Sequence, residues 1–128
     1  MQRDCECMRY AFFDGDDVSN IIEILFIENK VESAASLSGK LKSTVQEIEE
    51  LLNAQPGVDV ILSGGDEMLI RYDPTVIGIT FLENIRRIFV SKTGISLSCG
   101  VGISISESIH NLRLAKLYGK NQTRGAEN

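Results

Sequence analysis

The sequence contains a single histidine, three cysteines and no apolar run close to the roughly 20 residues that cross a bilayer. His110 alone cannot form a histidine pair, so mechanisms that need two histidines are excluded. An odd cysteine count without a secretion signal predicts reduced thiols, and Cys5 and Cys7 lack the second pair that would complete a zinc site. The polar N-terminus MQRDCECMRY is unlike a signal peptide, so we expect a cytoplasmic protein with no membrane partner.

An excess of positive charge is also missing. The formal net charge is −5 and the isoelectric point is about 4.9, which disfavours a broad basic face for duplex nucleic acid. An acidic protein can still bind nucleotides where metal ions screen its carboxylates. The length, with a hydrophobic content of 43%, predicts one globular domain over residues 1–128.

Hydrophobic patterning divides the chain into alternating strands and helices separated by Gly, Pro, Asn and Asp breaks. The expected elements are a strand at 9–13, helices at 18–29 and 31–53, hairpin strands at 58–62 and 68–72, a helix at 76–90, a strand at 95–104 and a helix at 107–119. Cys99 falls in the last strand and is expected to be a core residue. Residues 121–128, NQTRGAEN, are expected to be disordered or loosely attached.

The order of these elements predicts a fold. With one of the first two helices set aside, the pattern is βαββαβ, the ferredoxin-like arrangement. We therefore predict an α+β, ferredoxin-like domain with an antiparallel sheet and its helices on one face, in the order βααββαβα. In that topology the end of the first strand lies beside the tip of the central hairpin.

Two acidic segments are thereby predicted to meet at one edge of the sheet. Asp14, Asp16 and Asp17 follow the first strand, and Asp66 with Glu67 occupies the hairpin turn. Carboxylates crowded into one small region cannot all stay ionised without a cation nearby. Hard oxygen ligands select Mg²⁺ or Mn²⁺, and a pair of such ions roughly 4 Å apart can align an attacking hydroxyl with a triphosphate.

The same region offers groups that attract phosphate. Free N–H groups at a helix N-terminus bind anions, two glycines let a nucleotide approach the hairpin backbone, and two lysines at i, i+4 share a helix face. Each feature alone has an ordinary explanation as a helix cap, a tight turn or a solvated helix end. Their combination is what predicts a site, made by Asp17, Val18, Ser19, Asn20, Gly64, Gly65, Lys116 and Lys120.

Four segments, FFDGDD, SGGDE, SLSCGVGIS and AKLYGKN, occur in the order found in GGDEF-type and CRISPR-polymerase palm domains. The resemblance covers residues 10–121. Met68 stands where GGDEF proteins have Phe, and the N-D-x-x-G-H segment that reads guanine in them has no counterpart after Asp17. The Asp-Gly-Asp-Asp loop and the small size resemble the minimal CRISPR polymerase family, stand-alone palm domains associated with cyclic-oligonucleotide signalling in bacterial antiviral defence.

The resemblance implies a role for each matching residue. Asp14 and Asp66 would be metal ligands, with the Gly15 carbonyl joining them, and Glu67 would assist the metal site or the 3′-hydroxyl. Lys116 and Lys120 would hold the β- and γ-phosphates. The implied catalytic residues are Asp14, Asp66 and Glu67, and the implied nucleotide-binding residues are Gly15, Asp16, Asp17, Val18, Ser19, Gly64, Gly65, Lys116 and Lys120.

The leading hypothesis is a metal-dependent nucleotidyl cyclase that makes a cyclic di- or oligonucleotide from nucleoside triphosphates, with ATP favoured by analogy. Ring closure predicts a homodimer or higher oligomer, and a second messenger predicts a downstream receptor. One alternative is a catalytically inactive palm-like module that binds a nucleotide or a partner. Another is an aspartyl-phosphate phosphatase, because FFDGDDV matches its first motif, although that fold needs a larger parallel sheet.

Overall fold

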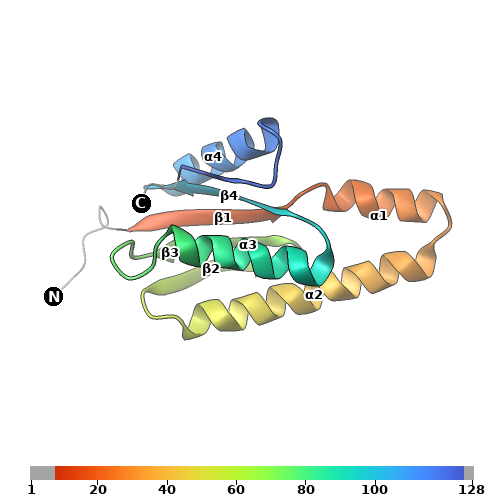
Figure 1. Cartoon of the computed structure of the whole chain (residues 1–128), viewed down its shortest axis with the longest axis horizontal. Helices are drawn as coiled ribbons and strands as arrows, with labels where there is room; N and C mark the ends of the chain where they lie inside the picture. The colour runs from red at the N-terminus through yellow and green to blue at the C-terminus, as the bar shows by residue number, and fades with distance from the viewer. Residues whose placement is uncertain (1–7, 126–128) are drawn as a thin grey trace.

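The computed structural model describes residues 8–125, and Cys5 and Cys7 lie outside that range. Its elements follow the predicted βααββαβα order with one added strand at the end (Figure 1). In chain order they are β1 (Arg9–Gly15), α1 (Val18–Ile27), α2 (Val31–Ala54), β2 (Val58–Gly64), β3 (Glu67–Tyr72), α3 (Ile79–Thr93), β4 (Leu97–Gly102), α4 (Ile105–Leu117) and β5 (Thr123–Arg124).

The five strands form one sheet in the order β2-β3-β1-β4-β5. Strand β1 pairs antiparallel with both β3 and β4, and β2 pairs antiparallel with β3. This is the ferredoxin-like arrangement, so the predicted α+β palm class is confirmed. A first strand with two antiparallel neighbours is incompatible with the parallel sheet that the phosphatase alternative requires.

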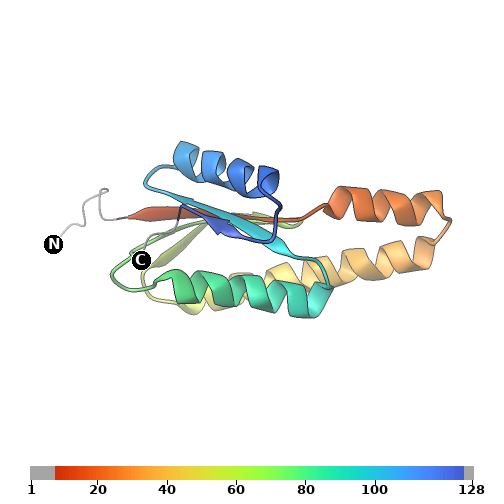
Figure 2. The same cartoon turned by 45° about the horizontal axis from the view of Figure 1, so that its top comes forward.

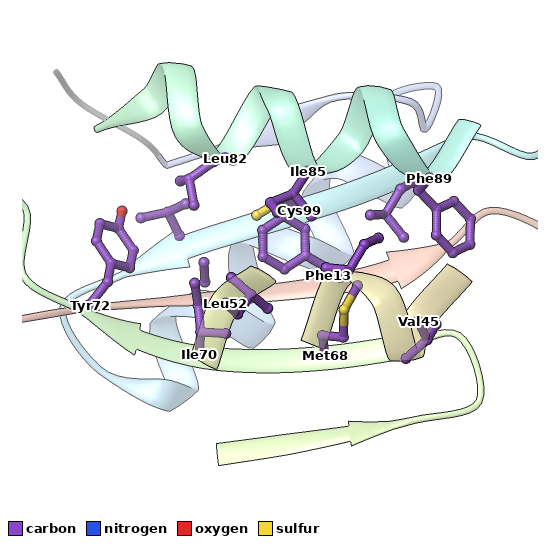
Figure 3. Packing of buried hydrophobic residues seen from close by; sticks show 14 of the residues in the cluster. Phe13, Val45, Leu52, Met68, Ile70, Tyr72, Leu82, Ile85, Phe89 and Cys99 are labelled. Atoms are coloured by element: carbon purple, nitrogen blue, oxygen red, sulfur yellow. The ribbon is translucent and has the colours of Figure 1, made fainter. Parts of the chain in front are cut away.

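The hydrophobic core lies between one face of the sheet and helices α2 and α3 (Figure 3). Phe13 and Met68 of the sheet and Phe89 of α3 lie in this core, and all three are fully buried. Helix α2 contributes its predicted apolar stripe, of which Leu41, Val45, Ile48 and Leu52 are buried. Cys99 lies in the same core, as expected, and burial raises the pKa of its thiol.

Helix α4 covers the opposite face of the sheet, so the expectation of helices on one face holds for α2 and α3 but not for α4 (Figure 1). The physical reason is that two residues on that face of β4, Gly100 and Gly102, have no side chain. A Cβ on Gly100 would lie 2.1 Å from the Leu112 nitrogen, and one on Gly102 would lie 2.6 Å from the Ser108 nitrogen. The two glycines therefore let the α4 backbone approach β4 directly.

Two helices begin at different residues from those predicted. Helix α3 begins at Ile79, after a turn in which the Asp73 side chain accepts hydrogen bonds from the Thr75 N–H and hydroxyl. Helix α4 begins at Ile105 because Ser104 is its cap, accepting from the Glu107 N–H at 3.1 Å. Glu107 in turn accepts from the Ile103 N–H at 2.7 Å. This reciprocal capping fixes the helix start.

The prediction of a disordered or loosely attached tail is wrong for residues 121–125. Strand β5 pairs in parallel with β4, and the Arg124 guanidinium lies 4.3 Å from the centre of the Tyr118 ring. The N–H of Asn121 donates to the Asp16 carboxylate at 2.9 Å. The segment after α4 is therefore attached to the edge of the sheet and to the acidic loop, residues 14–17, that ends β1 and precedes α1.

Helix α1 and the N-terminal part of α2 extend beyond the sheet as an antiparallel pair (Figure 1; Figure 2). Helix α1 has no fully buried residue, and Ile24, Phe26 and Ile27 are exposed on it. Asn29, with a φ of 59°, ends the helix at the break that was predicted. Within residues 8–125, no helix combines the length and apolar character needed to cross a membrane.

Candidate active site

The two acidic segments meet at one edge of the sheet. Asp14 pairs in register with Glu67, and the Gly15 N–H donates to the Asp66 carbonyl oxygen at 3.1 Å. With the start of α1 and the end of α4 they enclose a cavity of about 360 Å³, which we call the acidic cleft. The acidic cleft is lined by Asp14, Gly15, Asp17, Val18, Ser19, Asn20, Asp66, Glu67, Lys116 and Lys120.

Asp66 experiences the repulsion that the sequence predicted. Burial raises the pKa of its carboxyl above the ordinary value, and the negative charges of Asp14 and Glu67 raise it further. The positive charge of Lys116 only partly opposes this shift in pKa. A cation bound at this edge of the sheet would relieve the repulsion.

Gly15 is needed because β1 and the hairpin turn approach so closely. A Cβ at this position would lie 2.9 Å from Asp66 Oδ2 and 2.7 Å from Val18 Cγ2. Any side chain would push the hairpin turn away from the end of β1. The glycine thus places the Asp66 carboxylate next to the backbone that follows Asp14.

The Lys116 ammonium group lies among the oxygens that were predicted to hold a metal. It contacts the Asp14 carboxylate at 3.1 Å and donates to the carbonyl oxygens of Asp14 and Gly15 at 3.1 and 2.9 Å. It also donates to Asp16 at 2.7 Å. Lys116 therefore serves as a cation for the carboxylates here, whereas the sequence predicted contact with phosphate.

Asp16 does not line the acidic cleft but supports a residue that does. It is 5% exposed, and its carboxylate accepts hydrogen bonds from the hydroxyls of Ser98 at 2.8 Å and Ser96 at 2.6 Å. Burial alone would raise the pKa of Asp16, but the bonds from Lys116 and the two serines outweigh it and lower the pKa. Through these bonds Asp16 holds Lys116 in place. The two serines and Asn121 were missed, since each is more than 75 residues from Asp16 in sequence.

Asp17 and Lys120 form an ion pair across the mouth of the acidic cleft, with distances of 2.7 and 2.9 Å. Both have positive φ, 60° and 64°, and Asp17 makes no side-chain cap on α1. The side chains are 44% and 39% exposed, so the pair contributes at most about 1 kcal/mol. Lys120 can therefore exchange this partner for a phosphate beside the free N–H groups of Val18 and Ser19.

A second cavity, of about 470 Å³, lies between α1, α2 and the β2–β3 turn, and we call it the hairpin cavity. It shares Val18 and Asp66 with the acidic cleft. Gly64 and Gly65 line it, and a Cβ on either would meet nothing within 4 Å. The rest of its lining is Ile22, Ser38, Leu41, Lys42, Val45, Gln46, Glu49 and Ser63. The α2 residues were missed because polar positions on an amphipathic helix are usually a solvated face.

The acidic cleft fits a magnesium or manganese ion in its donor chemistry. Among residues 8–125, no group of three or more His, Cys, Asp or Glu side chains is gathered as a metal site. The donors present are the carboxylates of Asp14 and Asp66 and the carbonyl oxygen of Gly15. Mg²⁺ usually takes one or two protein carboxylates and keeps water and phosphate for its remaining positions, so this sparse oxygen set is suitable.

A family model described as the minimal CRISPR polymerase domain matches residues 10–126. A comparison with curated proteins returned no match.

Among solved structures, a Csm1-Csm4 cassette in complex with pppApA is similar, with a TM-score of 0.72 and 19% identity over 91% of this chain. Csm1-Csm4 cassettes in complex with cA4 and with one ATP are also similar, with TM-scores of 0.65 at 17% and 18% identity. In each case the similarity covers 20% of the other chain. At these identities the likeness shows a shared fold, and this chain corresponds to one part of those larger proteins.

Proposed function

Because the chain belongs to the minimal CRISPR polymerase family, we propose that it is a metal-dependent nucleotidyl cyclase that makes a cyclic di- or oligonucleotide messenger. The observation that carries the proposal is that Asp14 and Asp66, which are distant in sequence, line one cavity with Lys116 and Lys120. A nucleotidyl transfer needs oxygen ligands for a cation and positive groups for a triphosphate, and this cavity has both.

In the proposed complex the donor triphosphate occupies the acidic cleft. The N–H groups of Val18 and Ser19 and the ammonium group of Lys120 would bind its phosphate oxygens. Asp14, Asp66 and the Gly15 carbonyl would hold Mg²⁺ or Mn²⁺, which supplies charge neutralisation and a more acidic hydroxyl. Glu67, next to Asp66 at the same edge, would assist at the hydroxyl.

The donor base would lie in the hairpin cavity, which adjoins the acidic cleft through Val18 and Asp66. The apolar side chains of Ile22, Leu41 and Val45 would contact the base, and polar side chains of α2 would read its edge. Adenine is favoured because the Csm1-Csm4 cassettes of similar fold are described in complex with pppApA, cA4 and ATP.

Closing a ring requires two nucleotides that face each other, so we propose that the active species is a homodimer or higher oligomer. The product would act on a downstream receptor, and cytoplasmic antiviral defence is the proposed setting. Light scattering coupled to gel filtration gives the mass directly. A mass of one chain at the protein concentration of the assay would contradict the oligomer.

The test of the function is incubation of the pure protein with each nucleoside triphosphate and Mg²⁺ or Mn²⁺. We expect release of pyrophosphate and a phosphatase-resistant product whose mass identifies the base and the ring size. Asp66→Ala should abolish the product, whereas Asp59→Ala, which removes an exposed carboxylate on β2, should not.

Two outcomes would count against the cyclase. Absence of product with all four nucleotides and both metals would refute it for the isolated protein. Tight nucleotide binding without turnover would favour the alternative of a non-catalytic binding module. The internal ion pairs of both lysines of the acidic cleft are compatible with that alternative.

A further inference from the structure

A third cavity borders the acidic cleft on the α4 side and has no role in donor binding. Its volume is about 300 Å³, and we call it the α4 cavity. The α4 cavity shares Asp14 and Lys116 with the acidic cleft. The hairpin cavity shares two other residues, Val18 and Asp66, with the acidic cleft. The α4 cavity is lined by Asp14, Ile109, Leu112, Arg113, Lys116 and Leu117.

Arg113 is the cation of the α4 cavity that the fold does not use. Lys116 and Lys120, three and seven residues further along the chain, are paired with the aspartates of the acidic loop. Arg113 is exposed and, among residues 8–125, makes no hydrogen bond or ion pair. A guanidinium beside a phosphate-transfer site matches a phosphate group, which it can bind through two parallel hydrogen bonds.

Two apolar residues of the α4 cavity, Ile109 and Leu117, are also exposed without a structural need. Ile109 is 43% exposed and Leu117 is 74% exposed, although the opposite side of α4 packs closely on β4. An apolar surface beside one positive charge suits a nucleoside carrying a phosphate, with the base on the aliphatic side chains. The cavity lacks the helix N-terminus that would help to bind a triphosphate, and its other cation, Lys116, is already paired with Asp14 and Asp16.

We propose that the α4 cavity is the subsite for the acceptor nucleotide, with Arg113 binding its phosphate and Ile109 and Leu117 contacting its base. This inference rests on the proposed function. The acceptor's sugar hydroxyl oxygen would form a bond to the donor α-phosphorus, and the bond from that phosphorus to the β-phosphate oxygen would break. Pyrophosphate leaves, and the hydroxyl proton passes to solvent.

The experiment separates donor from acceptor by chemistry. AMP has hydroxyls but no leaving pyrophosphate, and 2′,3′-dideoxy-ATP has the leaving group but no hydroxyl. Mixed with the full-length protein and Mg²⁺ or Mn²⁺, they can give only the linear dinucleotide and pyrophosphate. Loss of one charged contact should raise the KM for AMP about tenfold in Arg113→Ala, with the KM for dideoxy-ATP unchanged. Arg113→Lys should recover part of the loss.

Arg87→Ala is the matched control, since Arg87 is an exposed arginine on α3 whose one hydrogen bond within the described part of the chain is to Asn84 nearby. The subsite is refuted if Arg113→Ala raises both KM values equally or neither. Methyl NMR gives a readout without turnover: AMP should shift the signals of Ile109 and Leu117 in the wild type but not in Arg113→Ala. Those shifts without any turnover would support the subsite while refuting the cyclase. No shift, with a lower oligomeric mass for Arg113→Ala, would assign the surface to a protein contact and overturn the proposal.

Discussion

Two aspartates of the site illustrate opposite uses of a carboxylate. Asp16 is buried, and hydrogen bonds compensate its charge and lower its pKa. Asp66 is partly buried, and the pKa of its carboxyl is raised first by that burial and then by its negative neighbours. Asp16 therefore stabilises the folded state when ionised, whereas ionised Asp66 destabilises it. Of the two aspartates, Asp66 is therefore the one whose ionised form a bound cation would stabilise.

Asp66→Asn is predicted to make the protein more stable at neutral pH. A folded pKa above the unfolded value means that ionising Asp66 costs more in the folded state, so the wild type loses stability as pH rises from the ordinary aspartate pKa of 3.8 through the raised folded value. Urea unfolding of both proteins at a series of pH values should show the gain of the variant above that window and its disappearance below pH 3.8.

The same variant tests the cation. Mn²⁺ or Mg²⁺ should raise the melting temperature of the wild type, because binding to the folded state stabilises it by mass action, and should have less effect on Asp66→Asn. Asp59→Asn, at an exposed position on β2, is the control and should respond as the wild type does. An equal metal response in all three proteins would place the cation elsewhere.

Gln46 is predicted to contribute to the choice of base. It lines the hairpin cavity from α2, and a primary amide offers both a donor and an acceptor to a base edge. Gln46→Leu should reduce the discrimination between ATP and GTP about tenfold, measured as the ratio of their kcat/KM values. Glu50→Ala, four residues along the same helix and outside the cavity, should leave the ratio unchanged. Unaltered discrimination in Gln46→Leu would exclude Gln46 from base reading.

At the scale of the elements, the position of α4 depends on the glycines of β4. The helix carries Arg113 and Lys116, so its distance from the sheet sets where both cations lie relative to Asp14. Gly100 faces the α4 backbone at a separation that no side chain can occupy. The contact between Gly100 and the α4 backbone therefore affects both the stability of the fold and the positions of the two cations in the site.

Gly100→Ala is predicted to destabilise the protein by about 3 kcal/mol, because the added methyl would overlap two backbone atoms that cannot move independently. Gly39→Ala is the control: Gly39 lies within α2 with nothing within 4 Å of an added Cβ, so alanine should stabilise by about 0.5–1 kcal/mol. Chemical denaturation measures both. A Gly100→Ala protein as stable as the wild type would mean that α4 can shift on the sheet.

The elements could be predicted because they depend on local signals, and their order then predicted the topology in which the two acidic segments meet. Helical and strand periodicity, and breaks such as Asn29 and Gly57, are visible within a few residues. The face chosen by α4 could not be predicted, since it depends on Gly100 meeting a segment that comes later in the chain. Strand β5 has two residues and no periodicity to detect. The supporting role of Asp16 depends on partners that only the folded chain brings together.

At the scale of the whole molecule, the proposed site is assembled from parts of unequal rigidity. The sheet and the α2–α3 layer form a continuous buried core, which fixes Asp14 at the end of β1 (Figure 3). Helix α1 supplies Val18 and Ser19 to the acidic cleft and Ile22 to the hairpin cavity, yet it has no fully buried side chain. The wall that would contact both the phosphates and the base is thus the part of the site with the least packing.

Sparse packing of α1 has a kinetic consequence. Its amide hydrogens should exchange with deuterium faster than those of α2 or α3, because local opening costs less where few apolar contacts must break. Addition of ATP with a divalent cation should slow exchange in residues 18–27 more than in 79–93, as the ligand closes the opening fluctuation. Mass spectrometry of peptides from these two segments would measure it, and equal protection factors with and without nucleotide would show that α1 is already rigid when the cavities are empty.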